Sequence, residues 1–487
     1  MSSFAKRWRA PAWLQGRALM GGGREPASLR AQVLHGGAYL VLRQGASVCL
    51  RLVGVLILTR LIGPSDYGLY SAALGVSTFW SELARMGTDF YLIRRQEESP
   101  DRVYDQVFSF LLVSSCGLAA LGVATLPLFG YWMGDSRFLP PLSALLVTLP
   151  LVVLRVPALS RLERALDYRA VAGLELSELA VFYAIAVVLA FMSLGVWALV
   201  ISFVISQVWV LGNGCRLSRY RPRWHWSADL FRELSQYALS FSISGWIWQL
   251  RPVIKAVVVG RFLGPEGIGY LTLAESMVDG LSFVKAAAWR LSIAALAKIQ
   301  DSLPSLRRAL EEAMALQVLA VGPFLAGFAV VSPWVVPLLF GERWRLTLVI
   351  YPFVAFGVLV NTVFNMHSSV LYVLKRNQEV GAKNAAHVVL LAAAAAWLVP
   401  MLGLVGWGVA EIVAMLGYVV IHLYVRRLFA IDYRRALLWL VAFSPPLFAS
   451  AAPGLLALAL WIPAVVVPFT PPARRQLGEY WAQLRGS

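Results

Sequence analysis

The chain has 487 residues, of which 59% are apolar and only 14% are charged. Soluble domains hold roughly 45–50% apolar and about 25% charged residues, so this composition excludes most cytosolic enzymes and indicates an integral membrane protein. The net charge of +17 would suggest nucleic-acid binding in a soluble protein, but the basic residues lie mainly between apolar segments, which argues against a nucleic-acid partner.

In chain order, residues 1–35 form a basic tail that lacks the apolar core of a signal peptide. A spanning helix needs about 20 mostly apolar residues, and twelve segments meet this requirement. They fall at 38–60, 68–92, 106–132, 138–159, 171–193, 195–215, 235–259, 268–292, 311–339, 346–372, 381–401 and 404–425. The stretch 436–470 is interrupted by prolines, and we predict two shorter spans there, which makes fourteen.

The connections between spans predict the orientation, because cytoplasmic loops are enriched in Lys and Arg. If the N-terminus is cytoplasmic, every inner connection carries basic residues, for example Lys375, Arg376 and Lys383 after the tenth span. The outer loops carry far fewer, namely Arg60, Arg137, Arg261, Arg343 and Arg345. The sequence therefore predicts that both termini are cytoplasmic. The outer loops are also short, which argues against an external catalytic domain.

A repeat links the turn after the first span to the turn after the seventh. Arg60, Gly63, Pro64 and Gly68 match Arg261, Gly264, Pro265 and Gly269, each at a separation of 201 residues. Because this separation equals six spans, the two halves have the same orientation, as parallel repeats require. The predicted fold is an all-α polytopic membrane protein with 12 core helices in two pseudo-twofold-related six-helix lobes and about 2 C-terminal helices.

The predicted domains follow from this layout. They are the tail at 1–35, an N-lobe at 36–216, a basic linker at 217–234, a C-lobe at 235–427, and a C-terminal part at 428–487 that holds the last two spans and a cytoplasmic tail.

Eight basic residues fall inside predicted spans, where a charge costs about 2.5–3.5 kcal/mol on insertion scales. They are Arg43, Arg51, Arg85, Arg155, Arg251, Lys255, Lys285 and Arg290. Arg51 and Arg251 are 200 residues apart, as are Arg85 and Lys285, so these cations would face one another across the two lobes. The hypothesis is a cationic cavity for an anionic headgroup, built from Arg51, Arg251, Lys255, Arg85 and Lys285.

Two alternatives stay open for these cations. Those near span ends, such as Arg43, Arg155 and Arg290, could extend to the membrane surface. Others could pair with acidic residues of the spans, namely Glu82, Asp89, Glu275 or Asp279.

Glu275 and Asp279 share a helical face and could bind a coupling ion, although neutralisation of Lys285 is the interpretation we favour. Trp246 and Trp248, next to Arg251, could stack on sugar rings.

No known catalytic or metal-binding pattern occurs. Three separated cysteines give neither a disulfide framework nor a CxxC site, and the five histidines have no metal-ligand spacing. We predict no catalytic residue, no metal and no cofactor.

Several segments resemble the polysaccharide-exporter, or Wzx-like oligosaccharide flippase, branch of the multidrug/oligosaccharidyl-lipid/polysaccharide (MOP) flippase superfamily. Residues 59–70, TRLIGPSDYGLY, resemble its signature at the first turn. Residues 161–169 are similar to its inner loop between spans 4 and 5, and residues 338–344, LLFGERW, to its turn after span 9. Gly195-Val196-Trp197-Ala198 and Gly403-Leu404-Val405-Gly406 open spans 6 and 12 in the manner of this branch. The resemblance covers about residues 36–430.

This resemblance implies a MATE-like rocking transporter, not an enzyme, in the bacterial inner membrane. It would flip undecaprenyl-diphosphate-linked oligosaccharides, the repeat units of O-antigen, capsule or exopolysaccharide. Arg51, Arg251 and Lys255 would bind the diphosphate. Its partners would be this lipid-linked oligosaccharide, membrane lipid, and a polysaccharide polymerase with its chain-length machinery. The alternatives are a cation-coupled small-molecule or drug antiporter of the same superfamily and a membrane glycan polymerase or ligase.

Overall fold

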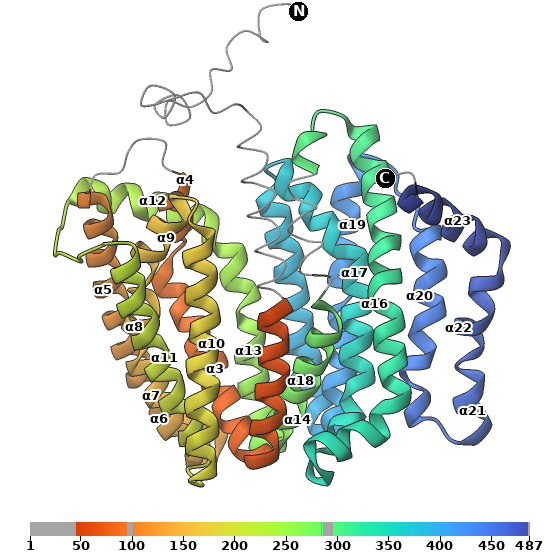
Figure 1. Cartoon of the computed structure of the whole chain (residues 1–487), viewed down its shortest axis with the longest axis horizontal. Helices are drawn as coiled ribbons and strands as arrows, with labels where there is room; N and C mark the ends of the chain where they lie inside the picture. The colour runs from red at the N-terminus through yellow and green to blue at the C-terminus, as the bar shows by residue number, and fades with distance from the viewer. Residues whose placement is uncertain (1–44, 95–100, 284, 286–295, 486–487) are drawn as a thin grey trace, which may run out of the picture.

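The computed structural model describes residues 45–94, 101–283, 285 and 296–485, and every regular element in these ranges is a helix. The predicted tail, Arg43 and Arg290 lie outside the described residues. Figure 1 shows two groups of helices side by side, with the last helices of the chain at one edge.

The first group follows a helix at residues 45–61. Its members are α3 (Pro64–Arg85), α4 (Thr88–Arg94), α5 (Asp101–Ala124), α6 (Leu126–Met133), α7 (Leu139–Val147), α8 (Leu149–Val153), α9 (Val156–Arg164), α10 (Tyr168–Phe191) and α11 (Val196–Leu217). The predicted fourth span is divided into α7, α8 and α9, with a bend of 46°. Pro150 and Pro157 stand at the starts of α8 and α9, where proline removes a helical N–H donor.

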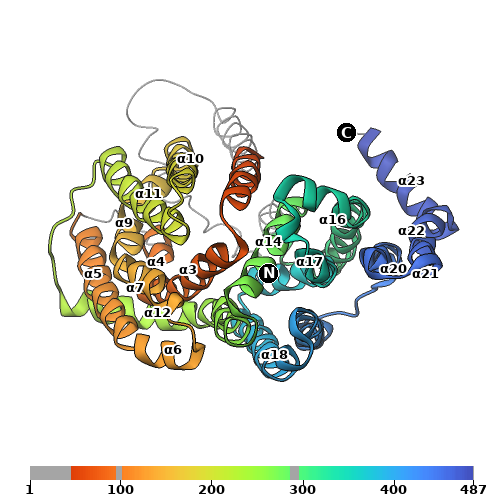
Figure 2. The same ribbon diagram turned by 90° about the horizontal axis from the view of Figure 1, so that it is seen from below.

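The second group begins with α12, which crosses from the first group in Figure 2. Its members are α12 (Ala228–Trp248), α13 (Leu250–Ile254), a π-helix at Lys255–Val259, α14 (Gly260–Leu281), α16 (Leu303–Phe340), α17 (Thr347–Val373), α18 (Asn377–Ala414) and α19 (Gly417–Arg426). Helix α12 thus starts inside the predicted linker, before the predicted seventh span. The predicted breaks at Gly264 and Gly403 are present as residues with positive φ, 68° and 62°, inside α14 and α18.

The C-terminal helices are α20 (Arg434–Leu447), α21 (Gly454–Ala459), α22 (Ile462–Val466) and α23 (Pro471–Arg485). Trp439 of α20 is buried in a core that α20 shares with α16, α17 and α19, and its Nε1 donates to Gln476 of α23 at 3.0 Å. Two short spans are predicted at 436–470. Among the described residues, the bent pair Gly454–Phe469 and Pro471–Ala482 is long and apolar enough to be one span, whereas the shorter α20 is not among the candidates.

Six helices among the described residues are long and apolar enough to cross a membrane, and up to eight if two bent pairs each count as one span. The protein is therefore an all-helical, multi-pass membrane protein. The other predicted spans are divided into shorter helices or carry more polar residues. Length and composition alone therefore do not identify them as membrane-spanning helices.

Helices α3 and α14 lie side by side between the two groups (Figure 2). A methyl group on Gly68 would overlap the carbonyl oxygen of Pro265, and a methyl group on Gly269 would overlap the carbonyl oxygen of Pro64. The contact is reciprocal and has the 201-residue register of the sequence repeat. Glycine at these two positions permits the close approach of the backbones.

One turn farther along, Ser71 Oγ and Thr272 Oγ1 lie 2.7 Å apart in a hydrogen bond, again 201 residues apart. The local pseudo-twofold axis therefore passes between these two hydroxyls. We call this contact the seam and define it as Pro64, Gly68, Ser71, Pro265, Gly269 and Thr272.

Beside the seam, two helix ends exchange arginine caps. Arg60 Nε donates to the carbonyl oxygen of Leu339 at 2.6 Å, at the end of α16. In return, Arg343 donates to the carbonyl oxygens of Thr59 and Arg60, at the end of the first helix. The buried Trp344 donates from Nε1 to Thr59 at 2.9 Å. The carbonyl groups at both helix ends, which have no partner within their own helix, are thereby satisfied across the two groups.

The π-helix explains a one-residue change in the repeat. Arg51 and Arg251 are 200 residues apart, whereas Arg60 and Arg261, after the π-helix, are 201 apart. A π-turn accommodates one extra residue within a helix. The insertion in the second half therefore lies within Lys255–Val259.

The segment between α11 and α12 is fastened to α5. Asp105 Oδ1 accepts hydrogen bonds from the Tyr220 hydroxyl at 2.9 Å and from the Arg223 backbone N–H at 3.1 Å. Burial is the main cause that raises the pKa of Tyr220, and the neighbouring Asp105 raises it further, so the phenol stays protonated and donates. This buried carboxylate fixes the start of α12, which carries Trp248 towards the site described next.

Candidate functional site

A cavity of about 260 Å³ lies among α12, α13, α14, α17, α18 and α19. Its lining combines charged groups with aromatic and aliphatic side chains. The lining residues are Trp248, Arg251, Glu275, Asp279, Lys285, Phe353, Val354, Gly357, Val358, Asn361, His387, Glu411, Met415 and Tyr418. Four of the seven predicted site residues are therefore brought together here: Arg251, Lys285, Glu275 and Asp279.

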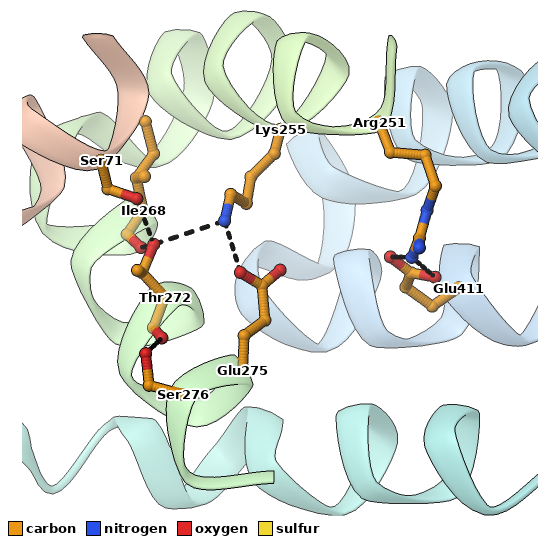
Figure 3. Close-up of polar contacts among 8 residues, drawn as sticks. All are labelled: Ser71, Arg251, Lys255, Ile268, Thr272, Glu275, Ser276 and Glu411. Carbon is orange, nitrogen blue, oxygen red and sulfur yellow. Dashed lines mark hydrogen bonds and ion pairs between the residues drawn. The ribbon is translucent and has the colours of Figure 1, made fainter. Parts of the chain in front are cut away.

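Arg251 is held at the cavity wall by a carboxylate and an indole. Its Nη2 donates to both carboxylate oxygens of Glu411, each at 2.8 Å (Figure 3). Its Cζ atom lies 4.7 Å from the ring centroid of Trp248, within cation–π range. Arg251 therefore pairs with an acidic residue, which is one of the two alternatives left open above. The partner is Glu411, 160 residues away, and not one of the four acidic residues named there.

Lys255 connects the acidic wall of the cavity to the seam. Its Nζ lies 2.5 Å from Glu275 Oε2 and donates to Thr272 Oγ1 at 3.3 Å (Figure 3). Thr272 is the residue that meets Ser71 at the seam, so one chain of contacts runs from Glu275 to Ser71. The interpretation favoured from the sequence is neutralisation of Lys285; Glu275 pairs with Lys255 instead, whereas Asp279 lines the same cavity as Lys285.

Lys285 lies beyond the end of α14 at Leu281, although the sequence placed it inside the eighth span. Its predicted counterpart Arg85 is the last residue of α3. Arg85 and Lys285 are 200 residues apart, but they do not occupy equivalent positions in their helices. Arg85 forms an ion pair with Glu82 at 3.1 Å, one of the predicted acids, and is absent from the cavity lining.

Arg51 is exposed on the first described helix and is also absent from the cavity lining. It forms no ion pair with any residue that the structure describes. Arg155, for which a position at the membrane surface was one explanation, forms an ion pair with Glu178 at 2.9 Å.

Lys383 is the residue that sequence reasoning placed wrongly. The loop charges assign it to an inner connection, but α18 begins at Asn377, and Lys383 lies within that helix with only 7% of its surface exposed. Its Nζ is 4.8 Å from the ring centroid of Trp248 and 5.8 Å from that of Tyr418. The available signal was its position inside the predicted span 381–401.

A second cavity of about 390 Å³ lies between α10 and α11 and contains none of the predicted site residues. Within the described ranges, no group of three or more His, Cys, Asp or Glu residues is arranged to hold a metal ion.

A sequence profile of the family described as polysaccharide biosynthesis protein matches residues 57–349, more than half of the chain. Two curated relatives are similar in sequence. The succinoglycan biosynthesis transport protein ExoT of Rhizobium meliloti (strain 1021) is 27% identical over 48% of this chain, and the match spans only 47% of that protein. The lipopolysaccharide biosynthesis protein WzxC of Escherichia coli (strain K12) is 25% identical over 71% of this chain and 70% of its own length.

Solved structures show the same fold. The lipid II flippase MurJ in an inward closed conformation superposes with a TM-score of 0.68, covering 91% of this chain and 99% of that one at 13% identity. An inward-facing multidrug resistance MATE family transporter of the MOP superfamily gives a TM-score of 0.59, covering 80% of this chain and 98% of that one at 16% identity. At these identities the likeness establishes the fold alone. The profile match places the chain in the polysaccharide biosynthesis protein family, and the two sequence relatives support its Wzx-like transporter branch.

Proposed function

We propose that this chain flips an undecaprenyl-diphosphate-linked oligosaccharide, a repeat unit of O-antigen, capsule or exopolysaccharide, across the bacterial inner membrane. Support comes from the family match and from the names of the two sequence relatives, one a succinoglycan transport protein and the other a lipopolysaccharide biosynthesis protein. The observation that carries the proposal is an arginine in a cavity between the helices of the second group, Arg251, whose planar guanidinium suits bidentate contacts with phosphate.

The proposed layout has 12 core spans and 2 C-terminal spans, with both termini in the cytoplasm. The lobes are 36–216 and 235–427, joined by the linker 217–234, and they move about the fixed site by alternating access. The reciprocal contacts of the seam support a pseudo-twofold relation between the lobes. The seam and the exchanged arginine caps lie at the outer end in this orientation, so these contacts close the outer side.

In this mechanism the diphosphate binds from the cytoplasmic side to the cations of the cavity, Arg251 and Lys285. Lys255 does not line the cavity itself but is paired with Glu275, which does. Arg51 and Arg85 come into contact with the diphosphate when the lobes change their relative position. The polyprenyl tail stays in the lipid, because only the charged and sugar parts of the substrate cannot cross it unaided. Glu275 and Asp279 are the proposed site for a coupling ion. A polysaccharide polymerase with its chain-length machinery would use the product.

A cation-coupled small-molecule antiporter is the second candidate. The observation that favours it is the presence of three carboxylates in the cavity lining, Glu275, Asp279 and Glu411, which could hold an organic cation.

The test is the leaflet in which the lipid-linked glycan accumulates. Spheroplasts with and without the protein are treated with an impermeant lectin, and the accessible glycan lipid is quantified. We expect accumulation on the cytoplasmic face when the protein is absent. If the lipid reaches the outer face normally while polymer is lost, a step after flipping is affected and the flippase proposal is wrong. If neither changes, the antiporter becomes the better proposal.

A double substitution tests the proposed role of two arginines, one from each half. The double substitution Arg51→Ala/Arg251→Ala is expected to abolish glycan export, because it removes a cation from each half. Wild-type export with normal protein levels would contradict the assignment of these arginines to the diphosphate.

A further inference from the structure

The charge on Lys383 has no partner among the described residues. Its ammonium forms neither an ion pair nor a hydrogen bond with any of them, although only 7% of the residue is exposed. Burying an ammonium without a counter-ion is unfavourable, and contacts with aromatic faces offset only part of the lost hydration. A buried cation in this condition is a site that an anion would stabilise.

Lys383 shares one indole with Arg251. The Trp248 ring centroid lies 4.8 Å from Lys383 Nζ and 4.7 Å from Arg251 Cζ. Glu411, 2.8 Å from Arg251, is the one carboxylate paired with either cation among the residues that the structure describes. The local group of Arg251, Lys383 and Glu411 therefore carries a net charge of +1, and +2 if Glu411 withdraws.

The proposed substrate is a diphosphate that is esterified at both ends, so each of its two phosphates carries one negative charge. Two cations on one indole match these two charges. On this basis, and resting on the proposed function, we infer that Arg251 and Lys383, rather than Arg251 and Lys285, bind one phosphate each, and that Glu411 occupies Arg251 while the substrate is absent.

Glu411 suits the role of an internal substitute for phosphate. A carboxylate offers two oxygens to a guanidinium, as a phosphate does. Removing one partner of a buried ion pair is costly, so Glu411 keeps Arg251 from standing unpaired in the empty state. Binding then exchanges one anion on Arg251 for another. Lys383 reaches the second phosphate by rotation of its flexible stem past Trp248 and Tyr418, whose rings line the cavity.

The experiment compares two ligands of the purified full-length protein in detergent. One is a short-chain prenyl diphosphoglucose, and the other is the same molecule with a single phosphate. Affinities are measured by isothermal titration calorimetry for the wild type, Lys383→Gln, Lys383→Arg and Glu411→Gln. The exposed lysine at 298 supplies a charge-matched control, Lys298→Gln.

We expect the wild type to prefer the diphosphate ligand. Lys383→Gln should weaken diphosphate binding by about tenfold or more and leave monophosphate binding nearly unchanged, because a charge-assisted contact is lost from the second phosphate only. Lys383→Arg should restore the preference. Glu411→Gln should tighten binding of both ligands, because it removes the competing anion. Lys298→Gln should behave as the wild type does.

Equal loss of both ligands in Lys383→Gln, with no recovery in Lys383→Arg, would mean that Lys383 only supports the structure, and would overturn the inference. Weaker or unchanged binding in Glu411→Gln would overturn the role of Glu411. If the wild type prefers the diphosphate ligand and Lys383→Gln keeps that preference, the flippase proposal stands and the assignment to Lys383 fails. If the wild type binds neither ligand, the proposed function itself is contradicted, and this inference with it.

Discussion

The two halves of the chain are alike at the seam and different at the cavity. At the seam, Gly68 and Gly269 each pack on the proline of the other half, and Ser71 meets Thr272. At the cavity, the 201-residue register matches Glu275 to Leu74, which is apolar. The repeat is therefore retained where the halves touch, and the charges are concentrated in the second half.

The position of Lys255 shows how this difference arises. In the 200-residue register that holds up to the π-helix, its counterpart is Val55, a buried apolar residue of the first helix. Lys255 instead extends to Glu275 and Thr272. A fold with a symmetric seam can thus hold an asymmetric site, because side chains at the cavity can differ without moving the backbones at the seam.

The largest effect should come from breaking the symmetric region. Gly68→Ala and Gly269→Ala each place a methyl group against a proline backbone carbonyl, which cannot yield as a flexible side chain would. Overpacking costs typically about 1–3 kcal/mol, and here we expect the upper end or a failure to accumulate. Protein levels in membranes and the thermal midpoint of purified protein report this.

Because the contact is reciprocal, the two glycine variants should be affected alike. Gly117→Ala is the matched control, since nothing lies within 4 Å of an added methyl group there. A mild effect of one glycine variant and a severe effect of the other would show that the two halves do not share the contact equally.

The cavity should respond asymmetrically. Arg251→Gln leaves Glu411 without its partner, and breaking a buried pair costs up to about 3–5 kcal/mol, less here because the Arg251 side chain is 29% exposed. Arg51→Gln should change stability little, since Arg51 is exposed and unpaired among the described residues. The thermal midpoint compares the two variants.

Arg251→Gln/Glu411→Gln should recover most of the lost stability, because no unpaired charge remains. It should not recover glycan export. Equal destabilisation by Arg51→Gln and Arg251→Gln would contradict the asymmetry.

The arginine caps allow a finer comparison. Arg60→Ala frees the carbonyl groups at the end of α16, at a cost of about 1–2 kcal/mol. Its repeat counterpart Arg261 lies near Gly134, and no hydrogen bond to a helix end is present there in the described residues. Arg261→Ala should therefore be milder. Urea unfolding in detergent measures both, and the opposite order would show that the cap contributes little.

The smallest effect belongs to the hydroxyl pair. Ser71→Ala removes one hydrogen bond across the seam and should cost about 0.5–1.5 kcal/mol. Thr78→Val, which removes only a hydrogen bond to its own helix, is the control. If Ser71→Ala and Thr78→Val lower the thermal midpoint equally, the hydrogen bond between the halves stabilises the protein no more than a hydrogen bond within one helix does.

The sequence was sufficient for features that depend on local composition and spacing. Hydropathy predicted a membrane protein, and the Gly-Pro turns predicted both the break at Gly264 and the 201-residue register. The sequence could not predict the ion pairs. Arg251 and Glu411 are 160 residues apart and meet only because of how α13 and α18 pack against each other. Lys383 was misplaced for a related reason: Lys and Arg mark loops on average, and the buried exception depends on packing against Trp248.

The π-helix at Lys255–Val259 also bears on how the chain tolerates insertions and deletions. An extra residue in an ordinary α-helix turns everything beyond it by about 100°. Here the wider turn absorbs that residue, so Arg251 before it and Arg261 after it both keep the helical phase of their counterparts in the first half, Arg51 and Arg60. Deleting Val257 should relax the turn to a regular α-helix and leave both faces aligned, whereas deleting a residue from the middle of α14 should rotate one face away from its partner. At the π-helix, one residue can therefore be added or removed while the side chains of the flanking helical segments keep their directions.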